Sequence, residues 1–118
     1  KGENLALRMA KRALFFAQRN QFLKAYTLIY EAILNTQPTP QIDGTEKDIY
    51  DEKRMRLESS LNSKQRKTYH TIRLVRNAIA HGSEPKDSEI KQILANEEEL
   101  KRWVYEGYKL VEELINNT

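Results

Sequence analysis

The residues best suited to chemistry in this chain form one short run, Arg76-Asn77-Ala78-Ile79-Ala80-His81, followed by Gly82. The run joins a permanent cation, a polar amide and one of only two histidines at the end of a predicted helix. Histidine can move protons near neutral pH, and arginine can stabilise the charge on a phosphate during its transfer. Together these residue types are sufficient to cut RNA without a metal ion. Arg76, Asn77 and His81 are therefore candidate catalytic residues.

Charge is unevenly distributed around this run. The 118 residues include 20 Lys and Arg against 17 Asp and Glu, a net charge of +3. Residues 59–83 hold five bases and no acid, whereas residues 84–118 have a net charge of −4. Both histidines, His70 and His81, fall in the acid-free block. Such a basic stripe is a candidate footprint for a phosphate backbone. The alternative is a solvated helix face whose balancing acids lie elsewhere.

Length and composition limit what the chain can be. They predict one domain over residues 1–118 with a single modest core. The absence of cysteine excludes a disulfide framework and a thiolate metal site, and it suits a cytoplasmic location. No apolar run reaches the roughly 18 residues of a membrane span, and no signal-peptide pattern opens the sequence, so we expect no membrane partner. Because the sequence begins with Lys1 rather than Met, we expect a fragment of a larger protein.

The spacing of apolar residues predicts helices over about 5–18, 22–35, 49–61, 63–81 and 96–114, with a short helical piece over 88–94. Asn20 is a candidate cap for the second helix. Ser63 and Gly82 are expected to bound the long fourth helix, and a capping-box pattern starts the last helix at Asn96. Gly107 lies inside that helix, which indicates close packing against another helix. We predict an all-α bundle of four to five helices.

The fourth helix divides into two stripes at roughly 100° per residue. Its predicted apolar face consists of Thr68, Ile72, Val75 and Ile79, widened by Thr71 and Ala78. The opposite stripe consists of Arg66, His70, Arg73, Asn77 and His81. Arg76 lies at the border, about 140° around a straight helix from His81, so one helix alone is a poor two-residue site. Either the helix loosens at its end, or a second copy faces the first across a twofold axis and pools the residues.

Each of these residues also has a purely structural interpretation. His81 can bond the exposed carbonyls of the last helical turn and interact favourably with the helix dipole. Asn77 can cap or bond a neighbouring helix, and Arg76 can pair with an acid of the last helix. His70 can be a surface or interface residue.

The run Arg76-Asn77-Ala78-Ile79-Ala80-His81 resembles the signature of the HEPN superfamily, in which an arginine is followed by a polar residue and, a few residues later, by a histidine. The position at the end of a long helix, the paired N-terminal helices and the long C-terminal helix also resemble that family. The resemblance implies an HEPN-like bundle that forms a homodimer, with facing motif helices and a composite cleft. It also implies a metal-independent endoribonuclease that acts on single-stranded RNA and needs no cofactor.

The resemblance assigns roles to the residues of this chain. His81 would transfer the proton of the RNA 2′-hydroxyl or of the leaving 5′-oxygen. Arg76 would hold the non-bridging phosphate oxygens, while Asn77 would orient the imidazole or the phosphate. The products would carry 2′,3′-cyclic phosphate and 5′-hydroxyl ends. The RNA backbone would be guided by Arg66, Lys67, His70 and Arg73.

Several biological settings remain open at this point. In CRISPR type III ancillary CARF-HEPN nucleases, which act in antiviral defence, a sensor domain for cyclic oligoadenylate precedes the HEPN effector half. Other HEPN domains are stand-alone toxins paired with a nucleotidyltransferase-like antitoxin. A fused sensor domain or an antitoxin is therefore an expected partner. Two rival functions are a non-catalytic helical module that binds RNA or protein, and a regulatory bundle without a nucleic-acid role.

Overall fold

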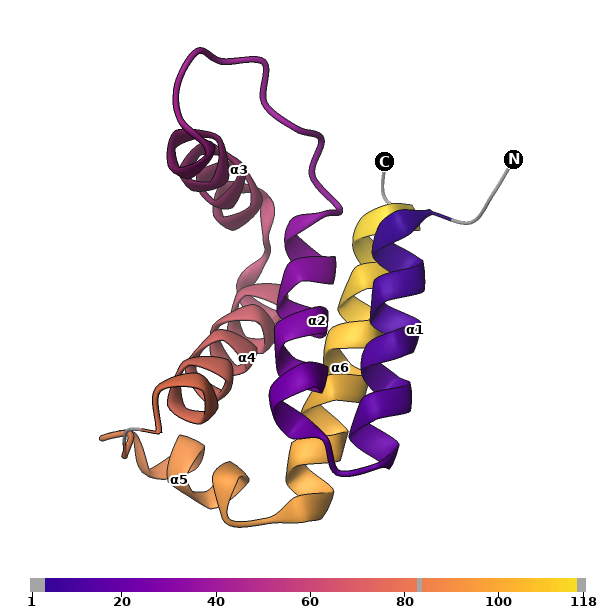
Figure 1. Cartoon of the computed structure of the whole chain (residues 1–118), viewed down its shortest axis with the longest axis vertical. Helices are drawn as coiled ribbons and strands as arrows, with labels where there is room; N and C mark the ends of the chain where they lie inside the picture. Colours follow the sequence, from indigo (N-terminus) through magenta and orange to yellow (C-terminus); the bar gives the residue numbers. More distant parts are fainter. Residues whose placement is uncertain (1–3, 83, 117–118) are drawn as a thin grey trace.

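The computed structural model describes residues 4–82 and 84–116, and it begins with an antiparallel pair of helices, α1 (Leu5–Gln18) and α2 (Phe22–Leu34) (Figure 1). The Asn4 side chain caps α1 by accepting a hydrogen bond from the Ala6 amide at 2.8 Å. Asn20 adopts a left-handed conformation, with φ of 59°, in the turn. No side-chain hydrogen bond caps α2, so the predicted cap at Asn20 is wrong: this asparagine serves the turn instead.

The long last helix, α6 (Glu97–Asn116), packs against α1, α2 and α4. Gly107 is buried at this contact, and a Cβ atom placed on it would lie 2.5 Å from Ile29 Cγ1 and 2.7 Å from Ile72 Cδ1. The close packing predicted from Gly107 is therefore confirmed. At the start of α6, Asn96 Oδ1 accepts from the amides of Glu98 and Glu99. The Glu99 carboxylate binds Arg102 at 3.0 Å.

Three further helices complete the described chain: α3 (Glu46–Ser60), α4 (Ser63–His81) and α5 (Ser88–Leu94). A reciprocal capping box between Thr45 and Asp48 starts α3 three residues earlier than predicted. Asn62, not Ser63, caps α4. Gly82 adopts the left-handed conformation that ends α4, as predicted.

The all-α class is confirmed, because the described residues form six helices and no strand. The predicted count of four to five is too low, since both the charged α3 and the short α5 are formed. Helices α1, α2 and α6 lie side by side, α4 packs against α2 and α6, and α3 lies beyond one end of α4 (Figure 1). No helix in the described ranges is long and apolar enough to cross a membrane.

The buried face of α4 is rotated from the predicted one. Tyr69 and Gln65 are buried, together with the expected Ile72 and Val75. Thr68 and Ile79, predicted to be central to the face, are only half-buried. The cause is the packing of α4 against both α2 and α6. This packing directs the Tyr69 side chain into the core.

Candidate functional site

Arg76 and Asn77 form a direct pair near the end of α4. Arg76 Nη1 donates a hydrogen bond to Asn77 Oδ1 at 3.0 Å. The guanidinium carbon of Arg76 also lies 5.2 Å from the centroid of the Tyr30 ring. This distance is within the range of a cation–π interaction. Asn77 of α4 and Tyr30 of α2 thus hold the side chain of Arg76.

The charge of Arg76 is not neutralised by an acid. In the part of the chain that the structure describes, Arg76 forms no ion pair, so the alternative of a pair with an acid of α6 is not realised. Its Nε is buried without a hydrogen-bond partner. Buried donors without an acceptor are uncommon in folded proteins, and each one calls for an explanation. Arg76 therefore retains both positive charge and unused donor capacity.

Three tyrosines form a cluster next to Arg76. The sequence did not predict this cluster. Tyr50 of α3 donates a hydrogen bond to the Tyr30 hydroxyl at 3.0 Å. The Tyr30 ring stacks on Tyr69 of α4 with centroids 5.9 Å apart. Tyr69 in turn donates to Glu58 Oε2 at 3.0 Å. The only available signal was the spacing that places Tyr30 one turn after Tyr26 and Tyr69 one turn before Ile72.

Burial keeps the hydroxyls of Tyr50 and Tyr69 protonated. Burial raises the pKa of Tyr50 above its usual range, and its hydrogen bond with Tyr30 adds to the shift, while Arg76 opposes it. Burial likewise raises the pKa of Tyr69, with its contacts to Tyr30 and Glu58 acting in the same direction. Neutral phenols at physiological pH can position a neighbour but do not serve as bases. The cluster is therefore a scaffold for Arg76.

His81 is the last residue of α4 and is exposed. No hydrogen bond or ion pair joins it to Arg76 or Asn77 within the described residues. It lies four positions after Asn77, so both side chains project from the same face of the helix. The structure thus brings Arg76 and Asn77 together and leaves the imidazole free in solvent, one turn further along.

The four residues expected to guide RNA are divided by the fold. Arg66, His70 and Arg73 line a hollow of about 260 Å³ together with Glu58 and Tyr69. The Arg66 guanidinium donates to the backbone carbonyls of Glu58 and Leu61, so it also holds the end of α3.

Lys67 is not in this hollow. Its ammonium forms an ion pair with Glu89 of α5 at 2.8 Å, and this hydrogen bond raises the pKa of Lys67. Asn77 lines a different hollow, of about 320 Å³. The other residues that line this hollow are Leu74, Ala78, Pro85, Lys86, Asp87 and Ile90.

The described residues contain no group of three or more His, Asp or Glu side chains placed to hold a metal ion. Comparisons with models of protein families, with curated proteins and with solved structures found no match for this chain.

Proposed function

We propose that this protein is an HEPN-like, metal-independent endoribonuclease that cuts single-stranded RNA. The observation that carries the proposal is the Arg76–Asn77 pair, in which an arginine with no acidic partner among the described residues is held at 3.0 Å by an asparagine one turn before an exposed histidine. A fixed guanidinium is suited to bidentate binding of phosphate oxygens. An exposed imidazole is suited to proton transfer.

The reaction starts from the RNA 2′-hydroxyl. His81 removes its proton as the 2′-oxygen attacks the adjacent phosphorus. Arg76 binds the non-bridging oxygens and stabilises the added charge of the five-coordinate state. Cleavage of the bond from phosphorus to the 5′-oxygen then sends a proton from an imidazolium to the leaving oxygen. The products are a 2′,3′-cyclic phosphate and a 5′-hydroxyl, and DNA resists cleavage because it has no attacking hydroxyl.

The complete site requires two chains in this proposal. Arg76 turns toward Tyr30, whereas His81 extends into solvent, so one chain presents a divided site. A second copy that packs its α4 end against the first would bring the arginine of one chain near the histidine of the other. The largely apolar hollow beside Asn77, lined by Leu74, Ala78 and Ile90, supports such a contact.

The test is cleavage of end-labelled single-stranded RNA in EDTA by the wild type and by His81→Ala. We expect cutting by the wild type, cyclic phosphate ends and no cutting by His81→Ala. A matched DNA oligonucleotide should remain intact. Activity that disappears on chelation and returns with magnesium or manganese would refute the mechanism, as would full activity of His81→Ala.

A further inference from the structure

The outward face of α1 is a basic surface outside the site. Residues 4–30 include five bases and no acid. Four of these, Arg8, Lys11, Arg12 and Arg19, fall with Phe15 within about 100° of one another around the helix axis. All five side chains are exposed. From Arg8 to Arg19 the stripe extends about 16 Å along the helix.

The three arginines of this face, Arg8, Arg12 and Arg19, have no acidic partner among the residues that the structure describes, unlike several cations of α3. Lys47 pairs with Asp51 at 2.9 Å and Arg56 with Glu52 at 2.9 Å, both along α3. In the described ranges, by contrast, Arg8, Arg12 and Arg19 form no ion pair. The charges of these three arginines are therefore not paired within the described residues, and they are available to an external anion.

An aromatic ring lies in the middle of this charge. Phe15 is 49% exposed, and it borders a hollow of about 560 Å³ together with Arg8, Lys11 and Arg12. The Arg19 guanidinium stacks on its ring, 3.7 Å from the centroid. An exposed ring set among cations is the pattern that binds single-stranded nucleic acids, because bases stack on the ring while the cations follow the phosphates.

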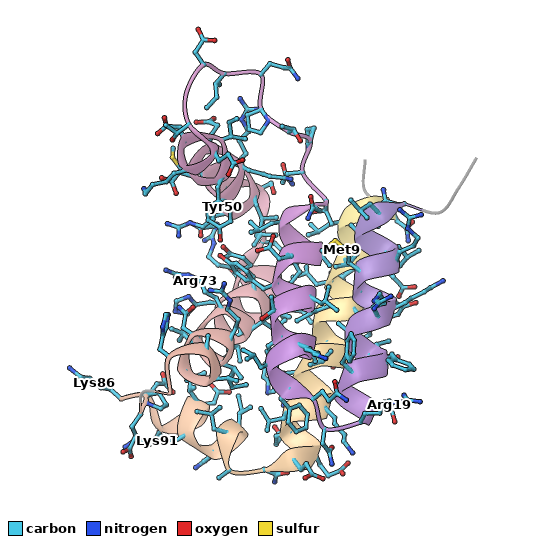
Figure 2. The ribbon with its side chains drawn as sticks, viewed as in Figure 1. Met9, Arg19, Tyr50, Arg73, Lys86 and Lys91 are labelled. Atoms are coloured by element: carbon cyan, nitrogen blue, oxygen red, sulfur yellow. The ribbon has the colours of Figure 1, made fainter. Side chains whose placement is uncertain are left out.

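We propose that the outward face of α1, defined by Arg8, Lys11, Arg12, Phe15 and Arg19, is a second binding surface for single-stranded RNA. That the anion is RNA rests on the proposed function. The surface is separate from the site, since Arg19 and Arg73 lie on opposite sides of the molecule (Figure 2). It would anchor a long strand away from the position of cleavage.

Nucleic acid suits this surface better than a membrane does. A helix that lies in a bilayer interface must bury an apolar face among the lipids. The small apolar residues of α1, Ala6, Ala10, Ala13 and Ala17, are already buried in the protein core. Leu5 and Phe15 are the only large apolar side chains that α1 exposes among the described residues.

The test is equilibrium binding of the 118-residue chain to 2′-O-methylated oligouridylate, longer than the roughly 4–16 nucleotides that such a surface occupies. Its blocked 2′-oxygen cannot attack, so binding is measured whether or not the protein cleaves RNA. The double variant Arg8→Ala/Arg12→Ala should bind about tenfold more weakly. Its salt dependence, log K against log salt, should lose about 1.4 units of slope, at roughly 0.7 per phosphate contact.

Two variants make the test specific. Lys47→Ala/Arg56→Ala removes the same charge from paired cations of α3 and should change binding less than about twofold. Phe15→Ala should weaken binding about tenfold without altering the salt slope, because stacking carries no charge. Circular dichroism should show the same helix content for all variants.

Equal losses from both double variants would overturn the proposal, because only net charge would then matter. It would also be overturned if the α1 variants bound the oligouridylate normally, including the case in which they lost binding to phosphatidylserine vesicles or to an acidic peptide instead. Weak binding by the α1 variants alongside a wild type that does not cleave RNA would support the surface and refute the proposed function. Normal binding by the α1 variants, together with RNA cleavage by the wild type, would support the proposed function and refute the α1 surface.

Discussion

Arg76 lies over the face of Tyr30, with its guanidinium carbon 5.2 Å from the ring centroid, and the two side chains come from different helices, α4 and α2. Tyr30 is only 2% exposed. Its hydroxyl accepts a hydrogen bond from Tyr50, and its ring stacks on Tyr69. Tyr30 is therefore buried and fixed, and its contact with the guanidinium restricts the position of the Arg76 side chain. It is a positioning residue for Arg76 in the proposed site.

We expect Tyr30→Leu to lower kcat/KM for RNA cleavage about fivefold, since a cation–π contact contributes about 1 kcal/mol. Tyr30→Phe keeps the ring and should restore most of the activity, although it removes the hydroxyl that Tyr50 contacts. Val104→Ala, a buried substitution away from the site, controls for lost stability. If Tyr30→Phe and Tyr30→Leu were equally impaired, the ring would not position Arg76.

Arg76→Ala should abolish cleavage while the protein remains folded, because the side chain is only half-buried at the edge of the core. Ile72→Ala, one turn earlier and fully buried, should instead lower the free energy of unfolding by about 2–5 kcal/mol. Urea denaturation and cleavage assays on both variants separate the two effects. An Arg76→Ala protein that cuts RNA at the wild-type rate would remove this residue from the mechanism.

Mixing Arg76→Ala and His81→Ala chains tests the composite site. If both arginines and both histidines form one shared site, no heterodimer has a full set, and activity should stay low. If two separate sites each take an arginine from one chain and a histidine from the other, the mixture should recover part of the activity. The amount of heterodimer is measured by native mass spectrometry. Full activity from a wild-type monomer would contradict a dimeric site.

Gly107→Ala should destabilise the fold, although alanine is the better helix former by about 1 kcal/mol. The added Cβ would meet Ile29 and Ile72 at 2.5 Å and 2.7 Å, and such overpacking costs about 1–3 kcal/mol. Gly82→Ala is the control, because no atom lies within 4 Å of its added Cβ and only backbone strain at φ of 62° opposes it. A rise in the urea midpoint of Gly107→Ala would contradict close packing of α6 against Ile29 and Ile72.

Asp48 should make the start of α3 sensitive to acid. Its hydrogen bonds with Thr45, of which the bond to the Thr45 amide is the largest cause, lower the pKa of Asp48. A lowered pKa in the folded state stabilises the cap above the unfolded value near 3.9, and this contribution disappears as the pH falls through the folded value. The α3 amides of the wild type should exchange more slowly than those of Asp48→Asn at neutral pH. The difference should shrink as the pH falls below the unfolded value and vanish once the folded carboxyl group is fully protonated. A difference that persisted at that point would exclude the carboxylate as its cause.

The helices that carry the candidate site follow from local signals in the amino-acid sequence. The αL glycine Gly82 and the apolar spacing of residues 63–81 act within a few positions along the chain, so they can be read locally. For the same reason, the sequence correctly predicts both ends of α1 and the position of Arg76 at the border of two faces of α4. The start of α3 was also encoded locally, by Thr45 and Asp48, but this signal was not recognised.

The rotation of α4 and the contacts of its charged residues depend instead on packing between helices. Packing on α2 and α6 turned Tyr69 inward and set Arg76 over Tyr30, 46 positions earlier in the sequence. It also paired Lys67 with Glu89 and directed Arg66 to the carbonyls at the end of α3. These partners are distant in sequence, and a helical wheel describes the angles within one helix but not the direction in which its neighbours lie.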